Sequence, residues 1–411
     1  MSTETICRQG SLTCLVNGQV PTDGALLKSI TIGMDPLSDF IRDQYLADFI
    51  KRGGSKIKFV TGRQGSGKTH FSVVLTQAAD ESGYLTVAFS AKDVWLHDFK
   101  EIYLRIIREF DIEHVLKGCA DRIIREMGYD PSSIDDGKTF MDYLSERGEA
   151  DPIVRGEIRT ALRQYFTRNP LLDNNFACCC SLLTGGILGH PVLETSSREM
   201  ILAFLNGDKT VKLSHLRALG LSPSHITKYN ARYLLRSLAE VVHLAGYAGL
   251  MVTIDDMEQV LNRSADKGLR YTKMRRDDTY ESIRQLIDDI DNMHHILFLL
   301  AFDRELLDNE NYGIKSYQAL WMRIQNEVVS TRFNGFADII DMDRYADAYY
   351  TEETLCEMSE RLVKVLTHHG ISARAIDTEG AKELVDRAQF GGLGLPWLVN
   401  RTVLEEEKAD V

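Results

Sequence analysis

Short continuous apolar runs and longer helical patterns alternate along the chain. The continuous runs predict buried strands at residues 57–60, 84–90, 250–254, 295–302 and 339–340. Helical spacing of apolar positions predicts helices at residues 70–79, 102–110, 153–166, 229–243, 355–366 and 380–388, with a last helix from Pro396. Strands that alternate with helices predict a parallel sheet between helical layers. The expected fold class is therefore α/β, with a three-layer, parallel-sheet core.

The order of these elements divides the chain into five regions. Residues 1–50 form an N-terminal segment, residues 51–110 carry the first two core strands, and residues 235–345 carry the others. Between them, residues 111–234 show helical pattern with polar breaks, which predicts an inserted helical subdomain. Residues 346–411 return to helical spacing and predict a C-terminal helical lid.

A glycine-rich loop follows the first predicted strand and precedes a predicted helix. Its sequence, GRQGSGKT, fits the pattern G-x-x-x-x-G-K-[ST]. The glycines allow a tight turn whose backbone N–H groups face a phosphate chain, and the helix N-terminus adds partial positive charge. The alternative is a glycine-rich turn without a ligand, and the strand and helix beside the loop argue against it. The predicted nucleoside triphosphate site consists of Gly62, Arg63, Gln64, Gly65, Ser66, Gly67, Lys68 and Thr69.

Two residues of this loop and one distant carboxylate predict the charge chemistry of the site. Lys68 is expected to reach the β- and γ-phosphates, and the Thr69 hydroxyl to bind Mg²⁺. Asp255 ends the strand predicted at residues 250–254, and ligands bind at the carboxyl ends of parallel strands. We therefore expect Asp255 to hold Mg²⁺ beside Thr69, directly or through water, with ATP and Mg²⁺ as the cofactors.

Several further residues are candidates for the hydrolytic step. Asp256 stands where ATPases of this arrangement usually have a glutamate that orients the attacking water, and Glu258 is the alternative. Asp303 follows the strand predicted at residues 295–302 and is a candidate for contact with the γ-phosphate or the water, or else lies in a surface turn. The candidates for an arginine that stabilises the transition state, from this chain or from a neighbouring subunit, are Arg304, Arg323 and Arg401.

Composition and charge limit the partners. Apolar residues make up 44% of the 411 positions and charged residues 26%, as in ordinary globular proteins. The net charge of −12 argues against a protein that coats nucleic acid, but a local basic patch is compatible with it. The N-terminal residues are polar and no apolar run is long enough to span a bilayer, so we expect a cytoplasmic protein without membrane contact. A basic segment after the acidic motif is either a solvated loop or a contact with DNA: Lys267, Arg270, Lys273, Arg275 and Arg276.

Further short segments of the sequence, taken together with the phosphate loop, show a resemblance to a known family. They lie at residues 17–21, 30–33, 87–90, 96–97, 204–207, 219–221, 230–231 and 246–255. With the loop, they resemble the ATP-binding proteins of the BREX phage-defence systems, a P-loop family similar to the AAA+ and origin-recognition-type ATPases. The resemblance implies an AAA+/RecA-like core, ATP and Mg²⁺ as ligands, and helicase- or methyltransferase-type partners. Asp256 and the pair Phe302 and Asp303 depart from the family pattern, and both departures concern hydrolysis rather than nucleotide binding.

The expected function is a Mg²⁺-dependent ATPase that acts as a motor or switch in a BREX-like defence complex. Ile32 and Gly33 are expected near the base. A homo-oligomer is expected if an arginine acts from a neighbouring subunit. One alternative is a nucleotide-gated scaffold with little or no hydrolysis. The other is a phosphotransferase, which the long insertion between Thr69 and Asp255 argues against.

Overall fold

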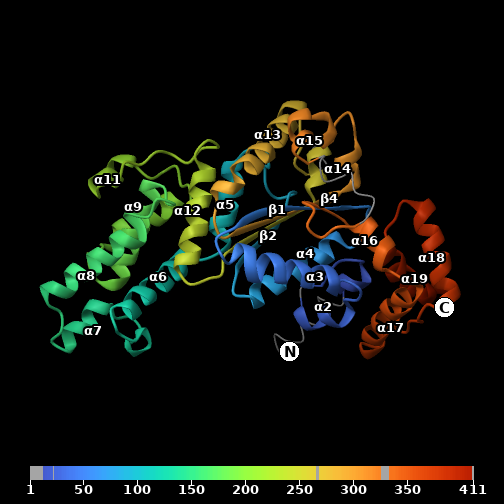
Figure 1. Ribbon diagram of the computed structural model, residues 1–411, viewed down its shortest axis with the longest axis horizontal. Coiled ribbons are helices and arrows are strands. Elements are labelled where there is room, and N and C mark those ends of the chain that lie inside the picture. The colour runs from blue at the N-terminus through green and yellow to red at the C-terminus, as the bar shows by residue number, and fades with distance from the viewer. Residues whose placement is uncertain (1–12, 22, 265–267, 325–332, 410–411) are drawn as a thin grey trace.

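The core of the chain is a parallel sheet whose strands come from distant parts of the sequence. A computed structural model describes residues 13–21, 23–264, 268–324 and 333–409 (Figure 1). Within these ranges, five parallel strands form one sheet in the order β2-β3-β4-β1-β5. They are β1 (Ser55–Gly62), β2 (Leu85–Ser90), β3 (Leu250–Asp255), β4 (Ile296–Asp303) and β5 (Ile339–Asp341). The predicted α/β class and each predicted strand are confirmed.

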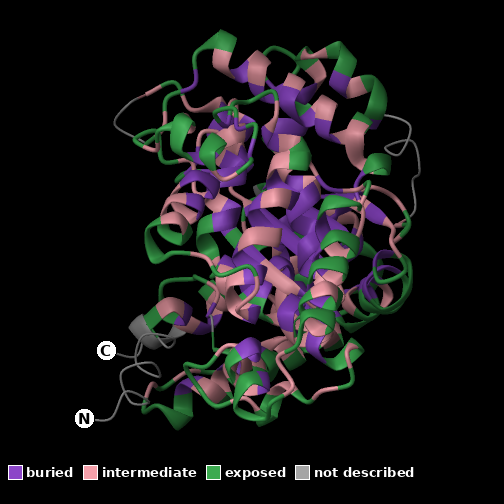
Figure 2. Cartoon of the chain, turned by 90° about the vertical axis from the view of Figure 1, so that its left-hand side faces the viewer, coloured by how far each residue is buried: buried purple, intermediate pink, exposed green. Residues whose placement is uncertain are grey.

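Both faces of the sheet are buried under helices. Successive side chains of a strand point to opposite faces, so a strand covered on both sides must be apolar at every position. Strand β4 follows this rule: Ile296, Phe298 and Leu300 enter one hydrophobic cluster, and Leu297, Leu299 and Ala301 enter the other. Figure 2 shows the buried residues concentrated along the sheet and the helices next to it.

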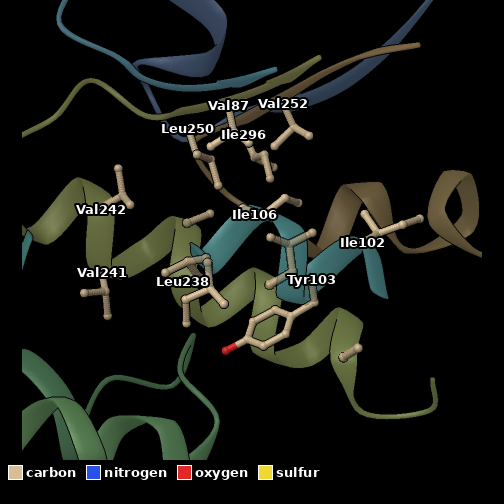
Figure 3. Packing of buried hydrophobic residues seen from close by; sticks show 14 of the residues in the cluster. Val87, Ile102, Tyr103, Ile106, Leu238, Val241, Val242, Leu250, Val252 and Ile296 are labelled. Carbon is tan, nitrogen blue, oxygen red and sulfur yellow. The ribbon is translucent and has the colours of Figure 1, made fainter. Parts of the chain in front are cut away.

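Different parts of the chain supply the two helical layers. On one face lie α5 (Phe99–Glu109), α12 (Ala231–Leu244) and α13 (Lys273–Asp289). Figure 3 shows α5 and α12 next to the strands, with these residues of the cluster labelled: Ile102, Ile106, Leu238, Val87, Leu250, Val252 and Ile296. Tyr103 of α5 points away from the strands. On the other face, α4 (Lys68–Glu81) packs through Phe71 and Leu75. Each fully buried side chain of this size stabilises the fold by roughly 1.5–3 kcal/mol.

The stretch between β2 and β3 is helical, as predicted. Beyond α5 it forms α6 (Ile112–Glu126), α7 (Phe140–Glu146), α8 (Pro152–Leu162), α9 (Asn174–Leu188), α10 (Thr195–Leu205) and α11 (Leu213–Ala218). A π-helical segment, Arg163–Thr167, continues α8, and a 3-10 turn lies at Pro131–Ser133. These helices extend away from the sheet on the left of Figure 1. Their treatment as a separate subdomain, like the other region boundaries, remains a proposal.

The N-terminal helices lie beside the C-terminal ones. Helices α2 (Gly24–Ile30) and α3 (Asp35–Ile41) precede β1, and a π-helical segment, Arg42–Ile50, continues α3. After β4 come α14 (Arg304–Asp308), α15 (Gln318–Ile324), α16 (Met342–Tyr349), α17 (Glu352–His368), α18 (Thr378–Gly391) and α19 (Leu395–Ala409). Further 3-10 turns lie at Met257–Leu261, Ile290–Asn292 and Ile314–Ser316. Helix α17 packs against α2, α18 and α19.

None of the helices in the described part of the chain is both long enough and apolar enough to cross a bilayer.

Candidate functional site

The carboxyl ends of four strands bring the predicted site residues to one edge of the sheet. In the register of the sheet, Gly62 pairs with Asp303 across β1 and β4, and Ser90 pairs with Asp255 across β2 and β3. Strand β4 lies between β1 and β3. The structure therefore brings together the glycine-rich loop, the acidic end of β3 and the tip of β4, which are far apart in the sequence.

The loop conformation depends on its glycines. Gly65 and Gly67 have φ angles of 77° and 93°, a left-handed region that favours glycine. A Cβ atom on Gly62 would lie 2.4 Å from Ser66 Oγ, so a larger residue would displace the inner side of the loop. Ser66 Oγ is itself buried and has no hydrogen-bond partner in the described part of the chain.

The loop and the start of α4 present a row of backbone donors. Among the described residues, no hydrogen-bond acceptor is found for the backbone N–H groups of Gly65, Gly67, Lys68 and Thr69. Helix α4 has 14 residues and no side-chain cap at its N-terminus. Uncapped N–H groups and the helix dipole both attract an anion, so this arrangement fits phosphate groups.

The Lys68 ammonium group lies inside the loop. Its Nζ donates to the carbonyls of Arg63 and Gly62 at 2.9 and 3.2 Å, and to Asp303 Oδ1 at 2.6 Å. The residue is only 8% exposed. Lys68 therefore connects the loop to the tip of β4, and a phosphate bound in the loop would compete with Asp303 for this cation.

The structure brings Thr69 and Asp255 together by a direct hydrogen bond. Thr69 Oγ1 donates to Asp255 Oδ2 at 2.6 Å, and Asp255 Oδ1 accepts the backbone N–H of Asp256 at 2.7 Å. Burial raises the pKa of Asp255, against the opposing effect of its hydrogen bond with Thr69. Mg²⁺ prefers a few protein oxygens together with water and phosphate oxygens, so this pair fits the ion. Among the described residues, no cluster of three or more His, Cys, Asp or Glu side chains could hold a metal on its own.

Asp256 is held on the β2 side of the site. Its Oδ2 accepts the Ser90 hydroxyl at 2.7 Å, and its Oδ1 accepts Lys92 Nζ at 2.7 Å. The backbone of Asp256 is left-handed, with φ of 57°. Burial lowers the pKa of Lys92, but the hydrogen bond and the charge of Asp256 outweigh this effect and raise it overall. A water molecule at Asp256 would therefore compete with two donors.

Glu258, the second acidic candidate, lies against the tip of β4. Its Oε2 accepts the backbone N–H of Asp303 at 3.0 Å. Burial, followed by the charge of Asp303, raises the pKa of Glu258 to about 7. A carboxyl group with this pKa is suited to proton transfer at neutral pH. Glu258, Asp303 and Lys68 thus form a connected chain that reaches the loop.

Sequence reasoning missed Asp343, which anchors the start of the loop. Its Oδ2 accepts the backbone N–H of Arg63 at 3.0 Å and Arg304 Nε at 2.9 Å. Arg304 also donates to Asp341 at 2.5 Å. The Arg63 guanidinium donates to the carbonyl of Ala388 at 2.6 Å. The sequence did contain one indication of this role. The strand predicted at residues 339–340 is followed by acidic residues, as are the strands that end at Asp255 and Asp303.

The structure places Arg323 in a different contact from the predicted one. Its guanidinium pairs with Asp288 of α13 at 2.5 and 3.0 Å and donates to the carbonyl of Ala319. Arg304 is engaged with the two carboxylates described above. The Arg401 guanidinium lies 5.9 Å from the centre of the Trp397 ring. Among the described residues, Arg304 and Arg323 form no hydrogen bond or ion pair with residues 62–69.

A cavity of about 420 Å³ lies beside the loop. Three parts of the chain line it: the N-terminal segment through Ile32 and Met34, the loop, and the C-terminal helices through Trp397. Gly33 lies behind this wall, where its carbonyl accepts the Tyr345 hydroxyl at 2.5 Å. The cavity combines apolar side chains with a few polar ones next to the loop, a lining that suits a nucleotide base.

His70 adds no charge to this cavity. Its Nε2 lies 2.7 Å from Thr31 Oγ1, and burial lowers the pKa of His70 to about 4. The imidazole is therefore neutral at pH 7.

The C-terminal helix α19 begins directly on the phosphate loop. Gly394 N–H donates to the carbonyl of Gln64 at 2.9 Å, and Trp397 N–H donates to the carbonyl of Gly65 at 3.2 Å. A Cβ atom on Gly65 would lie 2.3 Å from Trp397 Cβ. Sequence reasoning placed the start of a helix at Pro396 but did not predict this contact. The glycines at 391, 392 and 394 were the only signal of a close approach.

The basic segment predicted as a DNA contact is only partly exposed. Arg270 and Lys273 are exposed, and the Arg275 guanidinium lies 4.3 Å from the centre of the Trp95 ring. Arg276 is only 5% exposed and packs over the Tyr312 ring, so its assignment to a DNA-contacting surface is corrected. The fifth residue of the segment, at position 267, lies outside the described residues.

Comparison with known families identifies the chain. The family model described as BREX system ATP-binding protein BrxC/D matches residues 7–404. The chain belongs to this family. The resemblance inferred from the short segments is thereby confirmed. The family description implies ATP as the ligand and a role in a BREX defence system. No curated protein and no solved structure matches the chain significantly.

Proposed function

We propose that the chain is a Mg²⁺-dependent ATPase that acts as a nucleotide-driven switch in a BREX complex. The carrying observation is the convergence of Lys68 and Thr69 with Asp255 and Asp303 at one edge of the sheet. The position of β4 between the loop strand β1 and the acidic strand β3 supports a core of the AAA+/RecA-like type.

The phosphate groups and the metal have defined places in this proposal. The N–H groups of residues 65 and 67–69 bind the phosphate chain, and Lys68 moves from Asp303 to the β- and γ-phosphates. Thr69 and Asp255 would hold Mg²⁺, and the ion would supply positive charge to neutralise the phosphate oxygens. Ile32 and Trp397 contact the base in the cavity of about 420 Å³.

Two carboxylates serve the hydrolytic step in this proposal. Asp256 orients the attacking water once Ser90 and Lys92 release it, because both donors now occupy its oxygens. Glu258 has a pKa of about 7 and lies against Asp303, so it can take up the proton that the water loses. The contacts of Asp256 also suit a protein that hydrolyses ATP slowly.

The switch consists of the contact between α19 and the loop. Phosphates that draw the loop N–H groups inward also shift the carbonyls of Gln64 and Gly65, which α19 holds. A change of loop geometry thereby moves the C-terminal helices. A partner subunit of the defence system, or a second copy of the chain, can bind one position of these helices in preference to the other. This assigns the region of residues 346–411 the role of a lid.

A phosphate-release assay at saturating ATP and Mg²⁺ tests hydrolysis. Wild type should release phosphate without an added acceptor, and Asp256→Asn should reduce turnover by about 10²- to 10⁴-fold without abolishing ATP binding. Asp93→Asn is the matched control, because Asp93 is an exposed carboxylate on the segment after β2 that carries Lys92, and it should retain full turnover. Chelation of Mg²⁺ should remove turnover in each protein.

The main alternative is a nucleotide-gated scaffold. The observation in its favour is that Asp256 is already engaged by Ser90 and Lys92. Tight ATP binding without any phosphate release would support the scaffold and contradict the ATPase. Transfer of the phosphate only to an added small molecule would instead support a phosphotransferase.

DNA is proposed as a second ligand of the edge next to the nucleotide site. Arg270 and Lys273 are exposed there, and Arg275 lies over Trp95, a pairing of cation and ring that can also stack on a base. Phosphate contacts by the two exposed cations would give a salt-dependent affinity.

A further inference from the structure

Two buried polar atoms of the cavity beside the phosphate loop have no hydrogen-bond partner among the described residues. They are Tyr350 Oη and Asn400 Oδ1, and both residues line the cavity. Tyr350 is 7% exposed. Buried polar atoms without a partner are rare in native proteins because each is costly to leave unpaired. Two of them at one cavity indicate a ligand that pairs with both.

The two atoms have complementary hydrogen-bonding roles. The Asn400 amide donates through Nδ2 to the carbonyl of Leu15 at 3.5 Å, so the atom left for a ligand is Oδ1, an acceptor. Burial raises the pKa of Tyr350, so its hydroxyl stays protonated and can donate. The wall also contains apolar side chains, such as Ile32, Met34 and Trp397, and polar ones, such as Asn17 and Gln19. Tyr350 Oη and Asn400 Oδ1 thus add one buried donor and one buried acceptor to a mixed wall.

We infer that these two side chains select adenine: Asn400 Oδ1 accepts the exocyclic amino group of the base, and the Tyr350 hydroxyl donates to a ring nitrogen. The inference rests on the proposed nucleotide site at the phosphate loop, whose residues Gly65, Gly67 and Thr69 line the same cavity. Guanine carries a carbonyl where adenine has the amino group, so two acceptors would face each other at Asn400.

The position of Asn400 links base selection to the loop. Asn400 lies on α19, whose first turn donates to the carbonyl of Gly65 through Trp397, while Gly394 just before the helix donates to the carbonyl of Gln64. A base that pairs with Asn400 thus stabilises the same helix that contacts the loop under the phosphates. The C-terminal helices distinguish ATP from other triphosphates before any chemistry takes place.

Equilibrium binding of three purine triphosphates to the full chain tests the inference. They share the ribose and phosphates and carry an amino group, a hydrogen or a carbonyl oxygen at the same ring carbon: ATP, purine riboside triphosphate and inosine triphosphate. Wild type should bind ATP most tightly and the inosine nucleotide about tenfold or more weakly, with the purine nucleotide between them. Equal affinities for ATP and the inosine nucleotide would overturn the inference.

Two variants separate base reading from a structural role. Asn400→Leu should bring the three affinities to within about threefold of one another, because the acceptor is gone. Tyr350→Phe should weaken ATP binding while raising the melting temperature of the nucleotide-free protein, since it removes an unpaired buried hydroxyl. Asn311→Leu, at an exposed asparagine that does not line the cavity, is the matched control and should keep the wild-type order of affinities.

The remaining outcomes also decide the matter. An unchanged ratio of ATP to inosine nucleotide affinity in Asn400→Leu would overturn the role of Asn400. If none of the three triphosphates binds to wild type, the proposed function fails, and the base reading fails with it. If the three triphosphates bind to wild type with equal affinity, the proposed nucleotide site stands and only the inferred selection of adenine fails.

Discussion

Gly394 donates its backbone N–H to the carbonyl of Gln64 at 2.9 Å, although the two residues lie far apart in the sequence. Gly394 directly precedes α19, and Trp397 in the first turn of that helix donates its backbone N–H to the carbonyl of Gly65 at 3.2 Å. The start of α19 and the residue before it thus hold the carbonyl edge of the loop. The N–H edge of the loop is left for an anion.

The first prediction concerns this close approach. A Cβ atom on Gly394 would lie 2.3 Å from Ser66 N and 2.4 Å from Ser66 Cα, backbone atoms that cannot move aside without moving the loop. Gly394→Ala should therefore weaken ATP binding by about tenfold or more, measured by titration calorimetry.

Gly156→Ala is its control. Gly156 lies in α8, and a Cβ atom there would have no neighbour within 4 Å. ATP binding should be unchanged, and stability should rise by about 0.5–1 kcal/mol because alanine is the better helix former. If Gly394→Ala bound ATP as tightly as wild type, the close approach of Gly394 to the loop would not matter for nucleotide binding.

The second prediction concerns the ion pair between Lys92 and Asp256. The pair is partly exposed, with side-chain exposures of 56% and 30%, and such pairs contribute roughly 0.2–1 kcal/mol. Lys92→Met should free the carboxylate and raise kcat for phosphate release by about two- to fivefold. Lys117→Met, at an exposed lysine of α6, should leave kcat unchanged. A fall in kcat for Lys92→Met would mean that Lys92 assists the reaction instead of restraining Asp256.

The third prediction concerns pH and Glu258. Burial, with the charge of Asp303, raises the pKa of Glu258 from 4.5 to about 7. Between these values the folded protein binds more protons than the unfolded chain, so this group makes the protein less stable as pH rises through the window.

Glu258→Gln removes that ionisation and keeps an acceptor for the Asp303 N–H. The variant should be more stable than wild type by about 1–3 kcal/mol at pH 8, and the difference should nearly vanish near pH 4.5. Urea denaturation at both pH values measures it. A difference that does not depend on pH would show that Glu258 does not have a raised pKa.

The fourth prediction concerns the basic segment. The double variant Arg270→Glu and Lys273→Glu should weaken DNA binding across sequences and flatten the dependence of affinity on salt concentration. Lys364→Glu, an exposed lysine on α17, should change neither. A charge reversal at the buried Arg276 would destabilise the fold and would not report on DNA contact. An unchanged salt slope in the double variant would remove this segment as a DNA contact.

Local pattern was sufficient for the elements and for the loop. A strand buried on both faces must be apolar at each position, so the run at residues 295–302 predicted β4 to within a residue at each end. The loop at residues 62–69 depends on glycines and on the strand and helix beside it, and all of these are neighbours in sequence. Asp255 was also predictable, because a carboxylate that ends a buried strand faces the ligand edge of the sheet.

Tertiary structure decided which side chains complete the site. Asp343 reaches Arg63, and Gly394 reaches Gln64, only because β5 and α19 fold back onto the loop, and no local pattern encodes such a distance. Burial, likewise, is a property of the folded chain: it raised the pKa of Glu258 and removed Arg276 from the surface. The sequence alone thus determined the glycine-rich loop and the edge of the sheet at which it lies, whereas only the packing of distant segments determined how that loop is held and which side chains line the cavity beside it.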